Sequence, residues 1–530
     1  MSARSAGTGN EPWWESAVVY QIYPRSFRDT TGNGIGDLRG IIDGLDHLVW
    51  LGVDALWLSP VFRSPMVDHG YDVSDYCDVD PLFGSLDDLD ELIHKSHERA
   101  LKVLLDWVPN HTSDQHPWFQ ESRSSREDPR RDWYIWRDGD PDTPPNNWTR
   151  AFPFGEPAWS YDENTGAWFL HLFSPEQPDL NWANPDVREA MHDTLRFWLD
   201  RGVDGFRMDV IHGIGKNPAL PDLSDELAVI PATAFNDEPV THEYLRDIRV
   251  LLDEYPTRPV AVGEVYLLDT AQVATYYGDG DELHLAFNFP PMFSFWDAGM
   301  WRQNITTAQD LITAAGNWPT WVLSNHDNPR HRTRYGGDET IARAAAVLLL
   351  TLQGTPFLYA GEELGLEDAD VPPERIVDPS GGRRDGCRAP IPWTPDPGHG
   401  WEGPDPWLPF PPHSDRLNVA SERDDPDSML HFYRALLGVR HGSDALRLGS
   451  LDLLDAPDGV LAWRRTHEED ERIVLVNFTA GSQDIDRLTD HGVEISSDAT
   501  RAATVGVFDG VLRPREAVIL SPLGGVLRDV

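Results

Sequence analysis

The chain has 530 residues, with 44 basic and 88 acidic side chains and a formal net charge of −44. So acidic a surface disfavours nucleic acid and anionic membranes as partners, and neither is expected, because phosphates bind basic surfaces. The length predicts one large domain with one or two smaller ones, since a single core of ordinary size does not extend that far. The two cysteines, Cys77 and Cys387, exclude a disulfide framework and a cysteine metal cluster.

The sequence shows no targeting or membrane segment. The N-terminal stretch MSARSAGTGNEPWW lacks the apolar core of a signal peptide. No run of about 18 apolar residues occurs, so nothing predicts a membrane span. We therefore expect a cytoplasmic protein, a monomer or homodimer, whose partner is a small molecule.

Short apolar runs rich in β-formers follow one another, and segments with helical periodicity separate them. One helical segment, PDVREAMHDTLRFWLDRG, has Pro185 near its start and Gly202 at its end. Strands that alternate with helices indicate a parallel sheet with right-handed crossovers. Eight such units predict an α/β fold, a (β/α)8 TIM barrel. The predicted strands lie at residues 17–24, 53–61, 102–111, 203–212, 259–266, 283–289, 319–327 and 355–364.

Two segments lie outside this alternation. The stretch after the third strand is rich in Trp, Pro, Asp and Asn and too long for a loop, so it predicts an inserted domain B at residues 112–180. The catalytic barrel, domain A, then comprises residues 1–111 and 181–442. From residue 443 onward, alternating strands such as ERIVLVNFTA predict a C-terminal antiparallel domain, a β-sandwich over residues 443–530.

Polar side chains follow the carboxyl ends of several predicted strands. In a TIM barrel these ends form one rim, and the active site lies there. Arg207 and Asp209 share a face of the fourth strand, because residues i and i+2 of a strand point to the same side. The other rim residues are Asp106, Asn110 and His111 after the third strand, His212 after the fourth, Glu264 after the fifth, and Asn325, His326 and Asp327 after the seventh.

Carboxylates clustered with His and Arg favour glycosidic chemistry, which needs one ionised and one protonated carboxyl group. Arg207 would lower the pKa of Asp209 and keep it charged. Glu264 lies in apolar sequence, where desolvation would raise its pKa. The pattern therefore predicts Asp209 as the nucleophile and Glu264 as the general acid/base.

The motifs DWVPNH, GFRMDV, GEVY and SNHD, in this order, resemble the four signature regions of the α-amylase superfamily of glycoside hydrolases, family 13. GVDALWLSP, QPDLNW and GTPFLYAGEELG extend the resemblance over roughly residues 17 to 395. QPDLN and HGYDVSDY are similar to the oligo-1,6-glucosidase and α-glucosidase branch. The fold that this resemblance implies is a catalytic barrel, a domain B and a C-terminal β domain.

The resemblance also implies residue roles. Asp209 would form a β-glucosyl-enzyme, Glu264 would act as acid and base, and Asp327 would favour the distorted, oxocarbenium-like sugar ring. Phe173, just before QPDLN, is predicted to form a wall of the sugar site. A retaining mechanism would place the carboxyl groups of Asp209 and Glu264 about 5–5.5 Å apart. The implied substrate-binding residues are Asp68, Tyr71, His111, Arg207, His326 and Arg384, with Arg388 as an alternative to Arg384.

The function that the resemblance implies is a retaining, exo-acting α-glucosidase that releases glucose from short α-glucosides and also transfers it. Candidate substrates carry α-1,4 or α-1,6 linkages or are sucrose. Val210 resembles the α-1,6-preferring type, but the following IHGIGK departs from its usual continuation, so the linkage stays open. His212 either lines the acceptor side or holds a loop.

Two alternatives remain on the same scaffold. One is a dedicated transglucosylase or isomerase of the sucrose isomerase or trehalose synthase type, which would share the glucosyl-enzyme and differ in the acceptor. The other is a non-enzymatic transporter subunit, which is disfavoured because the three acids are present and no membrane helix is predicted.

The segment DTTGNGIGD resembles a calcium-binding loop of this branch. Thr31 stands where Asn is usual and Asn33 where Asp is usual, and fewer charges predict weaker binding. The expected cofactor is one structural Ca²⁺ or Mg²⁺, and no organic cofactor is expected. The predicted ligands are Asp29, Thr31, Asn33, Asp37 and the carbonyl oxygen of Ile35.

Overall fold

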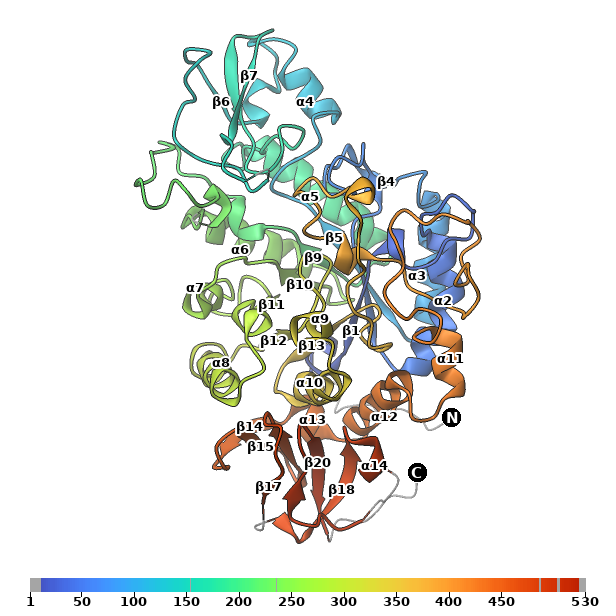
Figure 1. The fold of residues 1–530 in the computed structure, drawn as a ribbon. Coiled ribbons are helices and arrows are strands. Elements are labelled where there is room, and N and C mark those ends of the chain that lie inside the picture. The colour runs from blue at the N-terminus through green and yellow to red at the C-terminus, as the bar shows by residue number, and fades with distance from the viewer. Residues whose placement is uncertain (1–10, 153, 235, 486–487, 503–505, 524–530) are drawn as a thin grey trace.

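A computed structural model describes residues 11–152, 154–234, 236–485, 488–502 and 506–523. Residues 1–10, on which the expected lack of a signal peptide partly rests, lie outside these ranges. The molecule is elongated: domain B lies at one end, the barrel in the middle and the C-terminal domain at the other end (Figure 1). In the described ranges, no helix combines the length and the apolar character needed to cross a membrane.

Eight parallel strands form the central sheet, in the order β11-β10-β9-β5-β2-β1-β13-β12. Each lies within one of the eight predicted runs, which confirms the TIM-barrel class. The Thr320 hydroxyl joins the two end strands: it donates to the Ala286 carbonyl oxygen at 2.8 Å and accepts the Asn288 N–H at 3.3 Å. The strands are β1 (Val19–Ile22), β2 (Ala55–Leu58), β5 (Lys102–Trp107), β9 (Gly205–Met208), β10 (Val260–Gly263), β11 (Leu285–Ala286), β12 (Thr320–Val322) and β13 (Thr355–Tyr359).

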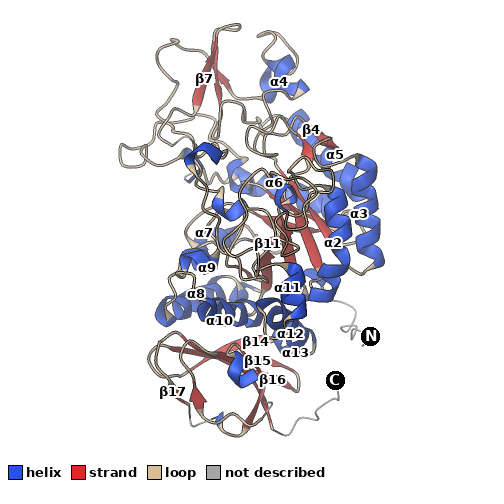
Figure 2. Ribbon diagram, turned by 45° about the vertical axis from the view of Figure 1, so that its right-hand side comes forward, coloured by secondary structure: helices blue, strands red, loops and turns tan. Residues whose placement is uncertain are grey.

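Helices cover the outside of this sheet (Figure 2). As predicted, α5 begins at Pro185, where the Asn184 side chain accepts the Asp186 N–H, and the chain turns at Gly202 with a φ of 95°. The main barrel helices are α2 (Leu38–Leu51), α3 (Leu86–Glu98), α5 (Pro185–Asp200), α6 (Val240–Asp253), α7 (Thr270–Thr275), α8 (Ala298–Leu311), α9 (His331–Arg334) and α10 (Glu339–Thr351), and the short α1 (Trp13–Ser16) precedes β1.

The segment between β5 and α5 forms a small sheet of its own, with the antiparallel order β6-β8-β7. Aromatic rings pack it against α4 (Pro117–Ser122), and the Phe119 and Phe169 centroids are 5.2 Å apart. An antiparallel bridge between His111 and Asp179 returns the chain to the barrel. Domain B is therefore fastened to the rim beside His111. Its strands are β6 (Trp136–Arg137), β7 (Trp159–Asp162) and β8 (Ala167–Leu170).

The C-terminal domain is a five-stranded antiparallel sheet in the order β14-β15-β16-β20-β18, and a separate two-stranded β17–β19 pair packs against it through Leu512. The predicted boundaries after residues 111, 180 and 442 stay predictions. The strands are β14 (Ser450–Leu454), β15 (Val460–His467), β16 (Asp470–Asn477), β17 (Gln483–Asp484), β18 (His491–Ser496), β19 (Val511–Leu512) and β20 (Ala517–Pro522), and α14 (Ala499–Ala502) follows β18.

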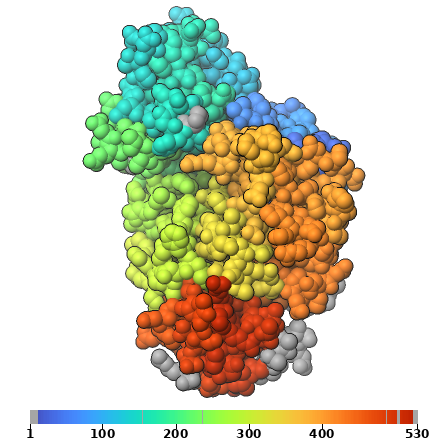
Figure 3. Space-filling view, viewed as in Figure 1, coloured from blue at the N-terminus to red at the C-terminus, as the bar shows by residue number. Residues whose placement is uncertain are grey.

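The long segment after β13 covers one side of the barrel. In the space-filling view this orange segment lies against the blue N-terminal part and below domain B (Figure 3). It brings Arg384 and Arg388 to the rim, where the hairpin β3 (Phe62–Arg63) and β4 (Asp75–Val79) brings Asp68 and Tyr71. The segment continues through α11 (Val419–Asp424), α12 (Met429–His441) and α13 (Asp444–Leu448) to the C-terminal domain.

Candidate active site

The Arg207 guanidinium joins the two predicted catalytic carboxylates. Asp209 directly follows β9, and Glu264 directly follows the neighbouring strand β10. Nη1 of Arg207 donates to Asp209 Oδ1 at 2.5 Å, and its Nη2 lies 2.9 Å from Glu264 Oε1. All three side chains are buried. The two carboxylates therefore face one guanidinium from adjacent strands.

Asp106, the rim residue of β5, is a third carboxylate on this guanidinium, and Arg207 Nη1 donates to its Oδ1 at 2.8 Å. Burial raises the pKa of Asp106 to about 6. Contrary to the prediction that Arg207 lowers it, the pKa of Asp209 is raised well above its usual value: burial raises it most, Arg207 opposes this rise, and the Glu264 charge adds to it. One cation among three buried carboxylates leaves an excess of negative charge, so we expect the cluster to hold a proton near neutral pH.

The surroundings of Glu264 differ from the expectation of an apolar site. Besides the Arg207 contact, the Val210 N–H donates to Glu264 Oε2 at 3.0 Å. Val210 has a φ of 42° and a ψ of 40°, a left-handed conformation that is rare and strained for a β-branched residue. The chain then turns into the short 3₁₀ helix η3 (Ile211–Gly213). The strained residue after Asp209 thus points its N–H at Glu264.

His326 lies beneath the rim in a line of hydrogen bonds. Its Nδ1 is 2.7 Å from Gln21 Nε2, its Nε2 is 2.6 Å from the Tyr71 hydroxyl, and that hydroxyl donates to Asp106 Oδ2 at 3.1 Å. Because the Gln21 amide nitrogen only donates, Nδ1 must accept, and the ring proton sits on Nε2. Burial lowers the pKa of His326 to about 3, which agrees with a neutral ring. The Tyr71 and His326 rings stack with centroids 5.4 Å apart.

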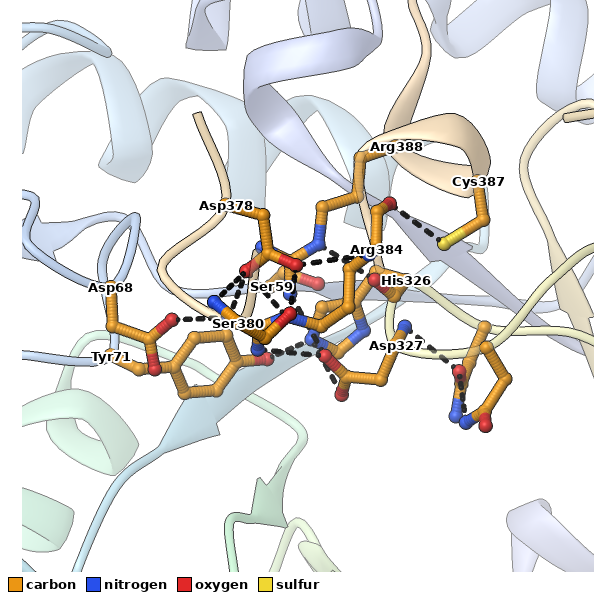
Figure 4. Close-up of polar contacts among 12 residues, drawn as sticks. Ser59, Asp68, Tyr71, His326, Asp327, Asp378, Ser380, Arg384, Cys387 and Arg388 are labelled. Atoms are coloured by element: carbon orange, nitrogen blue, oxygen red, sulfur yellow. Dashed lines mark hydrogen bonds and ion pairs between the residues drawn. The ribbon is translucent and has the colours of Figure 1, made fainter. Parts of the chain in front are cut away.

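Arg384 gathers three carboxylates at one side of the rim (Figure 4). Its Nη2 lies 2.7 Å from Asp68 Oδ1 and 2.7 Å from Asp378 Oδ1, and its Nη1 lies 3.2 Å from Asp327 Oδ1. The sequence left Arg384 and Arg388 as alternatives. Both contact Asp327, since Arg388 Nη2 lies 2.8 Å from the same oxygen, but Arg384 also reaches Asp68.

The charge state of Asp327 follows from these contacts. Burial by itself would raise the pKa of Asp327, but His326, Arg388 and Arg384 together hold it well below its ordinary value. Asp327 is therefore ionised throughout the neutral range.

His111 and Phe173 form the domain B side of the rim. The His111 Nε2 lies 3.2 Å from the Tyr71 carbonyl oxygen and 3.1 Å from Gln177 Nε2. The Phe173 ring centroid is 5.0 Å from the His111 ring and 5.6 Å from the Phe152 ring. Arg384 in turn lies over Phe152, 5.0 Å from its centroid. Aromatic and charged side chains thus form a continuous wall from His111 to Arg384.

Comparison with known proteins decides the family. The family described as "Alpha amylase, catalytic domain" matches residues 21–449. The chain belongs to the α-amylase family of glycoside hydrolases.

Relatives of this α-amylase-family enzyme cover nearly its whole length. An oligo-1,6-glucosidase of Parageobacillus thermoglucosidasius is 39% identical, over 90% of this chain and 92% of its own. The solved trehalulose synthase MutB from Pseudomonas mesoacidophila MX-45 is 35% identical with a TM-score of 0.89, over 96% of this chain and 99% of its own. The solved α-glucosyl transfer enzyme XgtA is 40% identical with a TM-score of 0.89, over 97% and 100%. The resemblance predicted from the four motifs is confirmed.

Several site residues of the α-amylase-family enzyme escaped the sequence analysis. Gln21 carried a signal, because it is a polar residue inside the apolar run AVVYQIYP. Gln177, which donates to Asp68 Oδ2 at 3.3 Å, stood inside the quoted QPDLN motif. Phe152 and Asp378 carried no signal in the sequence, because their place at the rim depends on the path of long loops.

Of the two roles predicted for His212, its contacts fit the one of holding a loop. Its ring nitrogens lie 3.3 Å from the Glu264 carbonyl oxygen and 3.0 Å from the Thr233 carbonyl oxygen.

The predicted cation loop of the α-amylase-family enzyme is closed by its own hydrogen bonds. Asp29 Oδ1 accepts the Thr31 N–H at 2.8 Å, and Asp37 Oδ1 accepts the Gly40 N–H at 2.7 Å at the start of α2. Asn33 Oδ1 accepts the Ile35 N–H at 2.9 Å. Within the described ranges, no three His, Cys, Asp or Glu side chains are grouped to hold a metal. The loop's donors are all oxygens, a set that suits a hard cation.

Proposed function

We propose that this α-amylase-family enzyme is a retaining, exo-acting α-glucosidase that removes single glucose units from the non-reducing end of short α-glucosides. The observation that carries the proposal is the Arg384 bridge between Asp68 and Asp327, 2.7 and 3.2 Å away. Hydroxyl groups of a terminal glucose would bind this pair, so further sugars could extend only away from it. The glycosidic bond would then lie at Asp209 and Glu264.

The reaction proceeds in two displacements. Asp209 attacks the anomeric carbon while Glu264 gives its proton to the departing oxygen, so that one C–O bond forms as another breaks. Glu264 then takes a proton from water, and the water oxygen displaces Asp209. Ionised Asp327 stabilises the positive charge that develops on the sugar ring. The proton expected in the Asp106, Asp209 and Glu264 cluster would be the one that Glu264 donates.

The linkage and the acceptor are the finer parts of the proposal. A relative named oligo-1,6-glucosidase and Val210 after the nucleophile support α-1,6 linkages, with α-1,4 linkages and sucrose as further substrates. A dedicated transglucosylase or isomerase is the second candidate. It is supported by the likeness to XgtA and to the trehalulose synthase, which was solved with sucrose as its substrate.

One product profile separates these functions. The purified enzyme is incubated with maltose, isomaltose, sucrose, trehalose and longer maltooligosaccharides, and the products are followed by NMR. The proposal expects free glucose as the main product, released first as the α-anomer because configuration is retained. An isomer or oligosaccharide as the main product from sucrose or maltose would establish the second candidate, and β-glucose would refute the retaining mechanism.

We also propose that the loop formed by Asp29, Thr31, Asn33, Ile35 and Asp37 binds one structural Ca²⁺ or Mg²⁺, supported by its oxygen-only donors. Added Ca²⁺ should then raise the unfolding midpoint by about 2 °C over EDTA-treated protein. Asn33→Asp should enlarge this shift, because it adds a charge, and Asp29→Asn should abolish it. Equal midpoints with Ca²⁺, Mg²⁺ and EDTA would refute the site.

The enzyme is proposed to be a monomer or a homodimer. Sedimentation would decide between these two states.

A further inference from the structure

Lys216 is a buried cation whose three N–H groups each have an acceptor. Its ammonium nitrogen lies 2.7 Å from Asp179 Oδ2, 2.6 Å from Asn110 Oδ1 and 2.6 Å from the Gly213 carbonyl oxygen. The side chain is 5% exposed and its Asp179 partner 0%. Stability alone does not explain this buried ion pair, because replacing a buried ion pair by apolar residues is often neutral or stabilising.

The three partners come from different parts of the fold. Asn110 follows strand β5, Asp179 lies where domain B returns to the barrel, and Lys216 lies in the loop behind the nucleophile strand β9. Space beside Asn110 is tight, since a Cβ atom on Gly213 would lie 3.1 Å from its Oδ1. Lys216 thus ties the domain B side of the rim to the loop that follows the nucleophile.

Lys216 also orients the Asn110 amide. An ammonium group only donates, so Asn110 must turn its oxygen toward Lys216 and its Nδ2 away. That Nδ2 lies 3.2 Å from Asp179 Oδ2 and 3.2 Å from His111 Nδ1. Because Nδ2 is a donor, His111 Nδ1 must accept. The proton of a neutral His111 ring is therefore on Nε2, which donates to the Tyr71 carbonyl oxygen 3.2 Å away; Gln177 Nε2, 3.1 Å from the same nitrogen, is itself a donor and does not accept this proton.

Asp179 and Lys216 also affect the charge of His111. Burial is the largest influence and lowers its pKa to about 4, the Asp179 carboxylate opposes this effect, and Lys216 adds to it. The next carboxylate, Asp68, reaches His111 through Gln177, which donates to it at 3.3 Å. Without Lys216, the buried Asp179 charge would be uncompensated beside the imidazole, and a proton on His111 would be the nearest way to neutralise it.

We propose that Lys216 is a positioning residue that keeps His111 neutral, with its proton on Nε2, in the glucose site. The inference rests on the proposed function for the sugar-binding role of His111. A cation at His111 would oppose the positive charge that develops on the sugar ring in the transition state, so the neutral ring serves the reaction.

The test follows His111 directly. The protein is labelled with ¹³C at the histidine Cε1 atoms, and the His111 resonance is the one that disappears in His111→Gln. In the parent protein this resonance should not titrate between pH 5 and 8. In Lys216→Met the pKa of His111 should rise by about two units, into that window. Lys95→Met, which removes a half-exposed lysine of α3, is the matched control and should leave the His111 resonance unchanged.

Two further variants separate charge from packing. Lys216→Met combined with Asp179→Asn removes both charges, so the titration of His111 between pH 5 and 8 should disappear again. The amide that replaces the Asp179 carboxylate would still offer an oxygen to the Leu172 N–H, which donates to Asp179 Oδ1 at 2.9 Å in the parent protein. Asn110→Asp retains Lys216 but puts an acceptor opposite Nδ1, so it should make His111 titrate even if Lys216→Met fails to fold. A His111 resonance that stays silent in Asn110→Asp, or in folded Lys216→Met, overturns the proposal.

Activity provides the second readout. The kcat of Lys216→Met should fall about ten-fold below that of the parent at pH 5 and approach it at pH 8, where His111 is neutral again. A loss of equal size at both pH values would show a merely structural role and refute the proposal. A parent enzyme that releases no glucose from any α-glucoside would refute the proposed function, while the NMR titration would still decide the state of His111.

Discussion

At the scale of single residues, the site depends on how buried charges are shared. Arg207 and Asp209 could be paired from the sequence, because their spacing places them on one face of a strand. The contact of Glu264 with Arg207 could not be predicted, since it follows from the parallel register of β9 and β10, in which Met208 pairs with Gly263. That register brings the residues after both strands to one guanidinium. Replacing one of the carboxylates on Arg207 therefore changes the protonation of the remaining carboxylates as well as the chemistry of the site.

Asp209→Asn should reduce kcat on aryl α-glucosides by about 10³-fold or more, because an amide is a poor nucleophile. The fold should remain, since the amide oxygen can still accept from Arg207. Steady-state kinetics and circular dichroism would measure both. Asp193→Asn, at a side chain 67% exposed, is the control and should retain full activity. Substantial activity in Asp209→Asn would contradict the nucleophile assignment.

Val210→Gly should leave the free energy of unfolding nearly unchanged. Losing the buried side chain removes about 2 kcal/mol, and glycine relieves strain of roughly 1–3 kcal/mol at a φ of 42°. Val262→Gly in β10, which has no strain to relieve, should lose about 3 kcal/mol. Urea unfolding compares the two variants, and equal losses would show that the Val210 backbone carries no strain.

At the scale of elements, the turn after β13 buries two adjacent carboxyl groups. The motif GEELG was recognised in the sequence, but its burial under α12 was not predictable, because it depends on the segment that crosses over the barrel. Glu363 Oε1 accepts from the Tyr20 hydroxyl at 2.8 Å and its Oε2 from the Gly361 N–H at 2.9 Å. Glu362 Oε1 lies 3.8 Å from His331 Nδ1. Burial raises the pKa of Glu362 to about 8.

This raised pKa predicts a loss of stability with rising pH. Folding favours protonated Glu362, so the stabilisation is complete below the unfolded pKa of about 4.5 and falls as the pH rises toward 8. Glu362→Gln keeps the shape without the charge and should exceed the parent in stability by roughly 3 kcal/mol at pH 8.5, with little difference at pH 4.5. Urea unfolding at both pH values measures this. Glu243→Gln, on the exposed face of α6, is the control, and its stability relative to the parent should not change with pH. The same pH-independent result for Glu362→Gln would show that Glu362 is solvated and contradict the prediction.

At the scale of the whole molecule, the barrel and the C-terminal domain meet around α10. Apart from Arg343, its sequence TIARAAAVLLL has apolar residues on all sides, because the helix is buried between the two domains (Figure 1). Two buried arginines bind carbonyl oxygens near its end. Arg465 Nη1 lies 2.6 Å from the Thr351 oxygen, and Arg440 Nη1 lies 2.8 Å from that of Leu350. Arg465 of the C-terminal domain thus joins the two domains by binding the C-terminal end of α10, where cations are favoured, and Arg440 of α12 binds beside it.

Arg465→Met should lower the free energy of unfolding by about 3 kcal/mol, because the carbonyl oxygens of Thr351, Gly449 and Ser450 lose the N–H groups that Arg465 donates to them. The active site is distant, so kcat should not change. Arg464→Met, the adjacent residue in β15, is the control: its side chain is 42% exposed, and it should lose less than about 1 kcal/mol. Denaturant unfolding and limited proteolysis would measure both variants. Equal stability in the two would show that Arg465 does not hold the domains together.

Local patterns in the chain were enough to predict the eight strands, the α-amylase family and the rim residues, because strand periodicity and strand-end motifs are local properties. Which of these residues share charge became visible in the folded molecule alone. The three carboxylates on Arg207, the Asp68–Arg384–Asp327 bridge and the contact of Lys216 with Asp179 join segments distant in sequence. Their partners depend on strand register and on the course of domain B and the long segment after β13, and no local pattern encodes these.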